Sequence, residues 1–367
     1  MEILDAVVIG AGQAGLSASY HLRRRGIDHV VLDSEEAAGG AWQHRWDSLT
    51  MTDVHGVAAL PDSPAPTRSE DRANVVVPAY FSDYERQHAL PVLRPVKVDR
   101  VTDDGGLLVV HAGDRGWRTR TLVNATGTWS QPHIPAYPGM WTFRGEQLHT
   151  ASYRGPEPFR DRRVVVVGGG LSAVQHLGEL APVAETLWVT RRDPVWRTDD
   201  FTAERGRAAV ALVEDRVRRG LPPRSVVSVT GLMLRPQERE AAALGAYQRQ
   251  PMFTRVEPDG VRLADGTLWR ADVILWATGF RPALGHLAPL RLRTRTGGIV
   301  LDGTTAVADP RVQLVGYGPS ASTIGANRAG RVAARSVAAR LGGTLGGPTA
   351  GHGPSGAAAP NMMAESA

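Results

Sequence analysis

Two stretches of this chain share one pattern, and that repeat constrains the fold more than any other feature of the sequence. The first is "VVIGAGQAG" at residues 7–15, and the second is "VVVVGGGLSA" at residues 164–173. Each contains an apolar β-branched run and a glycine-rich turn, and then a segment of helical periodicity leads to another apolar run. The sequence therefore predicts an α/β fold with two dinucleotide-binding, Rossmann-like βαβ units.

Glycine suits both turns for physical reasons. It permits a tight turn and lets backbone N–H groups approach a pyrophosphate, at which the positive end of the following helix dipole also points. The residues that we expect at the two pyrophosphates are Gly10, Gly12 and Gly15 in the first loop and Gly168, Gly170, Ser172 and Ala173 in the second.

The residue that ends the second strand differs between the two units. Asp33 and Arg191 follow the first glycine of their own loops at the same distance along the chain, and Arg192 comes next to Arg191. A carboxylate accepts hydrogen bonds from ribose hydroxyls, whereas arginine suits a 2′-phosphate. We therefore expect FAD in the first unit and NADPH in the second. The alternative is that the two arginines only solvate the end of a strand.

Two further strands end in Ala-Thr-Gly, "TLVNATG" at 121–127 and "DVILWATGFRP" at 272–282. Glycine there lets the backbone come close to a ligand. This adds Thr126, Gly127, Thr278 and Gly279 to the expected cofactor-binding residues. The predicted organisation is an FAD domain at 1–155 and 283–341, an inserted NADPH domain at 156–282 that includes an amphipathic helix at 203–219, and a disordered tail at 342–367.

Composition narrows the chemistry. The 367 residues include no cysteine, which excludes disulfides, thiolate catalysis and cysteine-ligated metals, and we expect no metal site. The net charge of +5 comes from arginines interspersed with acidic residues, without a nucleic-acid-binding motif. No apolar run is long enough for a bilayer, and no targeting segment is evident. We therefore expect a cytoplasmic protein with no nucleic-acid or membrane partner; a homodimer is compatible with the sequence.

An FAD site beside an NADPH site moves hydride from nicotinamide to flavin. In disulfide reductases the electrons continue to a cysteine pair, which this chain lacks. Molecular oxygen or a separate electron-accepting protein remains as the acceptor.

A third motif precedes the second loop. Phe143, Gly145, His149 and Tyr153 form a pattern that resembles the F-x-G-x-x-x-H-x-x-x-(W/Y) fingerprint of class B flavin-dependent monooxygenases. "GGAWQHRWDSL" at 39–49 is similar to the flavin-containing and YUCCA-like branch of that class. Taken alone, Phe143 and Tyr153 could also be packing residues with a surface histidine between them.

The resemblance implies a mechanism and site residues. In that class NADPH reduces FAD, O₂ forms a C4a-hydroperoxyflavin, and NADP⁺ shields it until a small-molecule substrate arrives. His149 and Tyr153 would position the nicotinamide at the crossing between the domains, and Thr52 or Asp53 stands near the active-site asparagine of flavin-containing enzymes. The further cofactor-binding residues implied are Gly40, Trp42, Arg45, Gly318, Thr323 and Asn327. Trp42, Trp46, Met51 and Trp129 would either wall the cavity over the flavin or belong to the core.

Three hypotheses follow. The first is an NADPH- and O₂-dependent flavin monooxygenase acting on a soft nitrogen or sulfur atom, with YUCCA-like decarboxylating oxygenation of a 2-oxo acid as its variant. The second is a cysteine-free NADPH:ferredoxin-type reductase, and the third is a non-enzymatic dinucleotide sensor.

Overall fold

The glycine repeat forms two βαβ units in this computed structural model, which describes residues 2–54, 57–196, 203–223, 231–232, 234, 236–321 and 323–345. Each unit has a strand, a helix and a second strand: β1 (Ile3–Ile9), α1 (Gln13–Arg23) and β2 (His29–Leu32), then β8 (Arg163–Val167), α3 (Leu171–Leu180) and β9 (Glu185–Thr190). The predicted α/β fold with two dinucleotide-binding units is confirmed.

The first unit belongs to a sheet of nine strands within the described residues. Its other strands are β3 (Val92–Leu93), β4 (Arg100–Asp104), β5 (Leu107–Ala112), β6 (Arg115–Asn124), β15 (Leu301–Asp302), β16 (Thr305–Ala306) and β17 (Val312–Leu314). The order is β15-β16-β17-β6-β1-β2-β3, and the antiparallel hairpin of β4 and β5 extends from β6. β1 pairs in parallel with β2 and β6, so the first glycine turn leaves the middle of the sheet.

The second unit forms a parallel sheet between β6 and β15 in the chain. With β7 (Glu146–His149), β10 (Gln250–Pro251) and β14 (Val273–Trp276), its order is β10-β9-β8-β14-β7. All four residues of β14 are buried, as expected for a parallel strand covered on both faces. A small antiparallel sheet of β11 (Arg255–Glu257), β12 (Gly260–Arg262) and β13 (Leu268–Arg270) follows α6 (Pro236–Ala243) in the chain.

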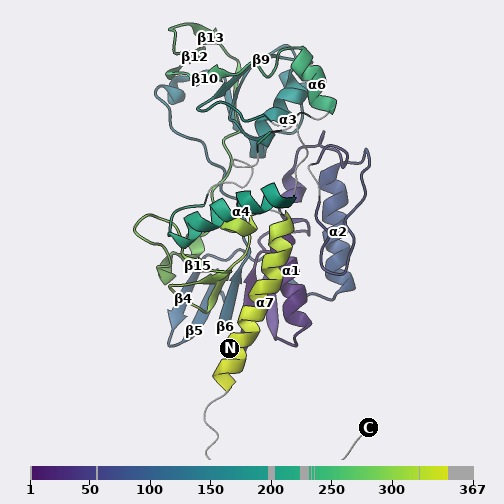
Figure 1. Ribbon diagram of the computed structural model, residues 1–367, viewed down its shortest axis with the longest axis vertical. Helices are drawn as coiled ribbons and strands as arrows, with labels where there is room; N and C mark the ends of the chain where they lie inside the picture. The colour runs from purple at the N-terminus through teal and green to yellow at the C-terminus, as the bar shows by residue number, and fades with distance from the viewer. Residues whose placement is uncertain are drawn as a thin grey trace, which may run out of the picture.

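The remaining elements of the described residues are helices. They are α2 (Ala73–Gln87), α4 (Ala203–Arg218) and α7 (Thr323–Leu345), with 3₁₀ helices η1 (Gly40–His44), η2 (Met140–Thr142), η3 (Thr150–Ser152), η4 (Glu157–Phe159), η5 (Gly285–Leu290) and η6 (Gly318–Ser320). Figure 1 shows two lobes, one with α1, α2 and α7 and the other with α3 and α6. None of the helices in the described part of the chain has the length and hydropathy that a bilayer crossing requires.

Two of the described segments that run between the lobes pair with each other. The N–H of His133 donates to the carbonyl of Gly279, and the N–H of Arg281 donates to the carbonyl of Gln131. Pro132 and Phe280 form an antiparallel bridge between these bonds. We call residues 127–135 and 279–283 the crossover ribbon. Because both Ala-Thr-Gly segments lead into it, the ribbon joins the ends of β6 and β14.

Three segments differ from the predicted organisation. β7 pairs with β14, so residues 146–149 lie in the second sheet although the sequence placed them before the boundary at 155. α4 follows the second unit in the chain but packs on the first, because Val217 is buried with Tyr317 and Ile299 there. α7 continues to Leu345, past the predicted start of the tail; residues 346–367 lie outside the described residues.

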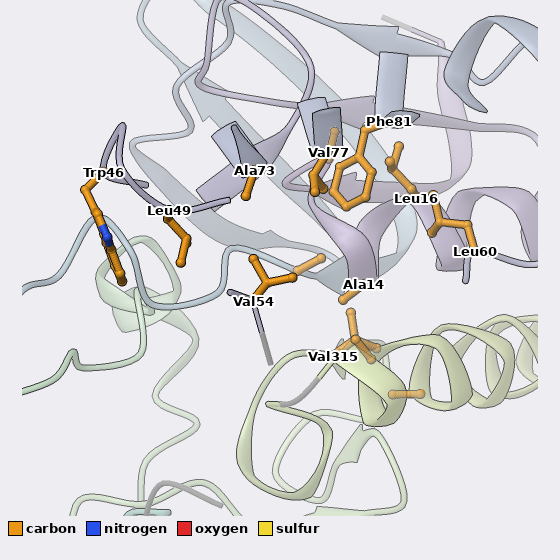
Figure 2. Close-up of a cluster of buried hydrophobic side chains, with 14 of the residues drawn as sticks. Ala14, Leu16, Trp46, Leu49, Val54, Leu60, Ala73, Val77, Phe81 and Val315 are labelled. Atoms are coloured by element: carbon orange, nitrogen blue, oxygen red, sulfur yellow. The ribbon is translucent and has the colours of Figure 1, made fainter. Parts of the chain in front are cut away.

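The core of the first lobe includes a segment without regular structure. Figure 2 shows Trp46, Leu49 and Val54 following one another along this segment, and their side chains are buried. Ala73, Val77 and Phe81 of α2 belong to the same buried cluster. The segment 46–54 is therefore fixed against the first unit by apolar packing.

Candidate functional site

The first glycine turn shows a division of roles among its glycines. Gly10 has φ of +98°, and a Cβ there would lie 2.7 Å from the carbonyl oxygen of Ala125. A Cβ on Gly15 would lie 1.8 Å from the carbonyl oxygen of Gly10. Gly12, by contrast, has no neighbouring atom within 4 Å of its Cβ position. Gly10 and Gly15 thus allow the turn to pack, while the space beside Gly12 is open.

Asp33 lies at the end of β2, facing the same turn. Its carboxylate accepts the N–H of Ala11 and, at 2.9 Å, the N–H of Glu35. The Arg94 guanidinium lies 3.7 Å from the Asp33 carboxylate and makes two hydrogen bonds of 2.6 Å to Glu85. Asp33 is therefore held in place from both sides.

A cavity of about 840 Å³ extends from the first turn to the crossover ribbon. This volume is within the range of small-molecule and cofactor sites, roughly 300–1,000 Å³. The predicted FAD-binding residues in its lining are Gly10, Gly12, Asp33, Gly40, Trp42, Arg45, Thr126 and Gly127. The structure therefore brings most of the residues that were predicted to bind FAD together around one cavity.

The second turn repeats the geometry of the first. Gly168 has φ of +146°, and a Cβ there would lie 2.2 Å from the carbonyl oxygen of Ala277. Gly170 has no atom within 4 Å of its Cβ position. Ala173 is fully buried, and Ser172 is half-buried in the first turn of α3. Each first glycine thus packs on the alanine of an Ala-Thr-Gly segment, and each middle glycine faces open space.

The threonines of the two Ala-Thr-Gly segments hold opposite ends of the crossover ribbon. The Thr126 hydroxyl donates to the carbonyl of Ala283, and the Thr278 hydroxyl donates to the carbonyl of His133. Gly127 and Gly279 have φ of +61° and +79°, so both positions favour glycine. These hydrogen bonds fix where the chain leaves each sheet.

A group of cations gathers at the end of β9. Arg191 and Arg192 are exposed. Arg249 donates to the Thr190 hydroxyl at 3.0 Å and forms a 2.7 Å ion pair with Asp193. Burial lowers the pKa of His133, and the nearby charges of Arg281 and Arg191 lower it further. Arg191 therefore lies close enough to the ribbon for its charge to act there.

His149 is fixed by both nitrogens of its ring. Nδ1 accepts the N–H of Ala151 at 3.1 Å, so Nε2 carries the proton and donates to the carbonyl of Gly279 at 2.9 Å. Burial lowers the pKa of His149, although the bond to Gly279 opposes this shift. The ring also meets Phe280 edge-on. His149 thus ties the end of β7 to the crossover ribbon as a neutral imidazole.

Tyr153 contacts a carboxylate that the sequence analysis did not single out. Its hydroxyl donates to Glu179 at 2.9 Å, and Glu179 also accepts the Trp46 indole N–H and the Ser48 hydroxyl, each at 2.7 Å. Burial raises the pKa of Glu179, which the three hydrogen bonds oppose. Tyr153 therefore belongs to a hydrogen-bond cluster between the lobes.

A half-buried arginine and a fully buried histidine lie beside this cluster. Arg45 lines the cavity with its guanidinium carbon 4.9 Å from the ring centre of Trp129 and 5.5 Å from that of Trp42. Burial lowers its pKa to about 10. His176 is fully buried, and burial with the charge of Arg45 lowers its pKa to about 3. Arg45 Nε and His176 Nδ1 have no hydrogen-bond partner among the described residues.

The other predicted residues lie elsewhere. The exposed Thr52 donates to the carbonyl of Ser69 and to Glu70, so its hydroxyl is engaged at the surface. Asp53 accepts the Thr50 hydroxyl at 2.7 Å. Neither is in the lining of the cavity, nor are His149 and Tyr153.

The last three predicted cofactor-binding residues, Gly318, Thr323 and Asn327, follow β17 in the chain. A Cβ on Gly318 would lie 2.7 Å from Val217 of α4, so Gly318 has a packing role. Thr323 begins α7, and its side chain lies outside the described residues. Asn327 accepts from Gln13 at 3.0 Å and donates to the carbonyl of Ala59. Ser320 and Ala321 line the cavity instead.

Sequence reasoning missed Glu179, Arg249 and His286. His286 lines the cavity and bonds to Asn124 at 2.6 Å, and burial lowers its pKa to about 4. Only Glu179 could have been found from the sequence. It is an acidic residue among apolar ones, Leu177 and Leu180, on the helix that follows the second glycine turn. No pattern marked the two others.

Known proteins are similar to this chain in sequence and in fold. A model of the pyridine nucleotide-disulphide oxidoreductase family matches residues 7–206. A flavin-containing monooxygenase structure from Stenotrophomonas maltophilia is 40% identical, covers 93% of this chain and 100% of its own, and has a TM-score of 0.81. The indole-3-pyruvate monooxygenase YUCCA1 of Oryza sativa subsp. japonica is 31% identical over 75% of this chain and 76% of its own.

A third similarity concerns the fold alone. The structure of OTEMO in complex with FAD and NADP is 17% identical, covers 93% of this chain and 85% of its own, and has a TM-score of 0.64. The family model and these two relatives agree with the resemblance to class B flavin-dependent monooxygenases. The chain is a member of the pyridine nucleotide-disulphide oxidoreductase family and, within it, belongs to the class B flavin-dependent monooxygenases.

Proposed function

We propose that this flavin monooxygenase uses NADPH and O₂ to oxygenate a small molecule at a nitrogen or sulfur atom. The observation that carries the proposal is the pair of equivalent glycine turns, each with open space at its middle glycine, joined by one crossover ribbon. Asp33 directly follows the second strand of the first unit, and Arg191 directly follows that of the second. The first adenosine site would therefore be acidic and the second basic.

The residues present fit FAD in the first unit and NADPH in the second. A side chain at Gly12 or Gly170 would fill the space that a pyrophosphate needs, because both Cβ positions are open. Asp33 would accept a ribose hydroxyl of FAD, and Arg191 with Arg192 would hold the 2′-phosphate of NADPH. When bound, the reduced flavin supplies the oxygen chemistry, as cofactors do in such enzymes.

The chain's own residues bind, orient and exclude water. Trp129 and Phe280 stack at 4.8 Å in the cavity wall, where they present apolar surface. The Nε2–H of His149 donates a hydrogen bond to the carbonyl of Gly279 and so holds the crossover ribbon in place. Because both its nitrogens are engaged, His149 is assigned to positioning. Transfer of oxygen to a soft nucleophile suits such a site, since the residues assigned here supply no general acid or base.

Arg45 favours a second candidate, decarboxylating oxygenation of a 2-oxo acid. Its guanidinium lines the cavity between Trp42 and Trp129, and its Nε has no hydrogen-bond partner among the described residues. A cation that is partly removed from water is stabilised by an anionic partner, and a substrate carboxylate would be one. Passage of electrons to a ferredoxin has no comparable feature in its favour. The cytoplasmic location and the homodimer stay predictions from the sequence.

Isotope incorporation tests this proposal. Purified enzyme with FAD, NADPH and ¹⁸O₂ is offered amines, thioethers and 2-oxo acids, and products are analysed by mass spectrometry. We expect one ¹⁸O atom in the product of an amine or thioether, with little release of hydrogen peroxide. Turnover of the 2-oxo acids alone would favour the second candidate. Electron transfer to ferredoxin without ¹⁸O incorporation into any compound would contradict both.

A further inference from the structure

Glu179 gathers three hydrogen bonds from two distant parts of the chain. It lies in the last turn of α3, in the second unit. Trp46 and Ser48 reach it from the segment packed on the first unit, and Tyr153 reaches it from the end of the fingerprint. The three donor–acceptor distances lie between 2.7 and 2.9 Å, as expected for strong hydrogen bonds to a carboxylate.

The neighbouring turn of α3 presents the same face to this segment. His176 packs against Trp46 and Tyr153, with ring centres 4.9 and 4.2 Å apart. His176 and Glu179 are three positions apart, so they lie on one side of the helix. Trp46 and Tyr153 are each 1% exposed, so their rings are closed to water, while Ser48 and Glu179 are half-buried. We call Trp46, Ser48, Tyr153, His176 and Glu179 the inter-unit cluster.

A carboxylate is a costly group at such a place. Burial raises the pKa of Glu179, and Asp53 raises it further through its charge. Among the described residues Glu179 forms no ion pair, so its three neutral donors are what compensates for lost hydration. An apolar side chain of similar size would satisfy packing alone. The carboxylate in addition fixes the orientation of the two segments, because its three hydrogen bonds form only when the donors approach at suitable angles.

We propose that Glu179 is a positioning residue for hydride transfer: it fastens the flavin-side segment 46–48 to helix α3 and thereby fixes the two dinucleotide units relative to each other. This inference rests on the proposed assignment of FAD and NADPH to the two units. Donor and acceptor rings must meet in a narrow range of geometries, and a small misplacement lowers the rate by orders of magnitude. The fingerprint tyrosine then acts through Glu179.

Three variants test the role of Glu179. Glu179→Leu removes all three hydrogen bonds, Glu179→Gln keeps the shape and one acceptor oxygen, and Tyr153→Phe removes one donor. Glu157→Gln is the control, because Glu157 is an exposed glutamate in an ion pair with Arg160. Each FAD-loaded variant is mixed anaerobically with NADPH, and the rate of flavin reduction is measured over a range of NADPH concentrations.

We expect the limiting rate of reduction to fall at least tenfold in Glu179→Leu and severalfold in Glu179→Gln and Tyr153→Phe. The Kd for NADPH should stay within threefold of the wild-type value, because the binding loops are untouched. Equal limiting rates in wild type and Glu179→Gln would overturn the proposal, even if Glu179→Leu fails to fold. A parallel loss of FAD content and NADPH affinity would overturn it too, since that pattern indicates general destabilisation.

Hydrogen exchange gives a readout that does not depend on catalysis. In Glu179→Gln the amides of residues 46–54 and 150–153 should exchange faster than in wild type, while those of β1 stay protected. Unchanged exchange in both segments would contradict the fastening role. If the wild type itself is not reduced by NADPH, the proposed function fails, and the exchange result still decides whether Glu179 joins the units.

Discussion

The protonation state of single residues at this site depends on the burial of their side chains and on nearby charges. His176 is the clearest case, since its imidazole is fully buried and lies within reach of the charge of Arg45. The folded protein therefore holds His176 neutral, whereas the unfolded chain protonates it near pH 6.5. Because the folded pKa is lowered, the stabilisation is fully present above pH 6.5 and is lost as the pH falls toward 3.

We predict that the free energy of unfolding falls between pH 7 and pH 5, with a contribution from His176 of about 2 kcal/mol. Urea denaturation at the two pH values measures it. His176→Gln should have a shallower pH dependence by that amount. The other histidines whose pKa burial lowers remain in both proteins and cancel in the comparison; they are His21, His29, His88, His133, His149 and His286. The same slope in both proteins would show that His176 is not held neutral.

Arg191 carries a prediction about cofactor choice. If its guanidinium holds the 2′-phosphate, Arg191→Ala should raise the KM for NADPH about tenfold or more, because hydrogen bonds to charged groups contribute about 1.5–3 kcal/mol. The KM for NADH should change less than twofold. Steady-state kinetics with both cofactors measures this, with Arg255→Ala as the control since Arg255 is an exposed arginine on β11. Equal effects on both cofactors would assign Arg191 to the solvation of the strand end.

At the scale of elements, the sequence predicted the strands, turns and helices that are encoded by local periodicity. Both βαβ units and both Ala-Thr-Gly strand ends appear where the glycines placed them, because a glycine turn after an apolar strand has few alternatives. Long-range pairing was less accessible. β7 joins the second sheet through hydrogen bonds to β14, more than a hundred residues away, and α4 packs on the first unit through Val217. Neither contact leaves a pattern in its own segment.

The contacts of the fingerprint residues were equally hard to predict from the sequence. Its residues were found by resemblance, but their roles depend on partners remote in the chain. His149 bonds to Gly279 of the crossover ribbon, and Tyr153 bonds to Glu179 of α3. Thr52, expected near the reacting centre, is held at the surface by Ser69 and Glu70. The sequence thus predicted the two loops better than it predicted the residues between them.

At the scale of the whole molecule, two similar dinucleotide-binding units are proposed to hold different cofactors. The first turn opens on a cavity with Asp33, and the second lies near Arg191. The two middle glycines offer a matched pair of variants, because neither has a positive φ and neither has an atom within 4 Å of its Cβ position. Gly12→Val and Gly170→Val should each keep the fold and close one pyrophosphate site.

The most direct measurement is the absorbance of these two variants after reconstitution with FAD and anaerobic addition of NADPH. We predict that Gly12→Val binds no flavin and stays colourless. Gly170→Val should be yellow, should be reduced by dithionite, and should be reduced by NADPH at least tenfold more slowly than wild type. A yellow Gly12→Val, or a Gly170→Val that NADPH reduces at the wild-type rate, would contradict the assignment of FAD to the first unit and NADPH to the second.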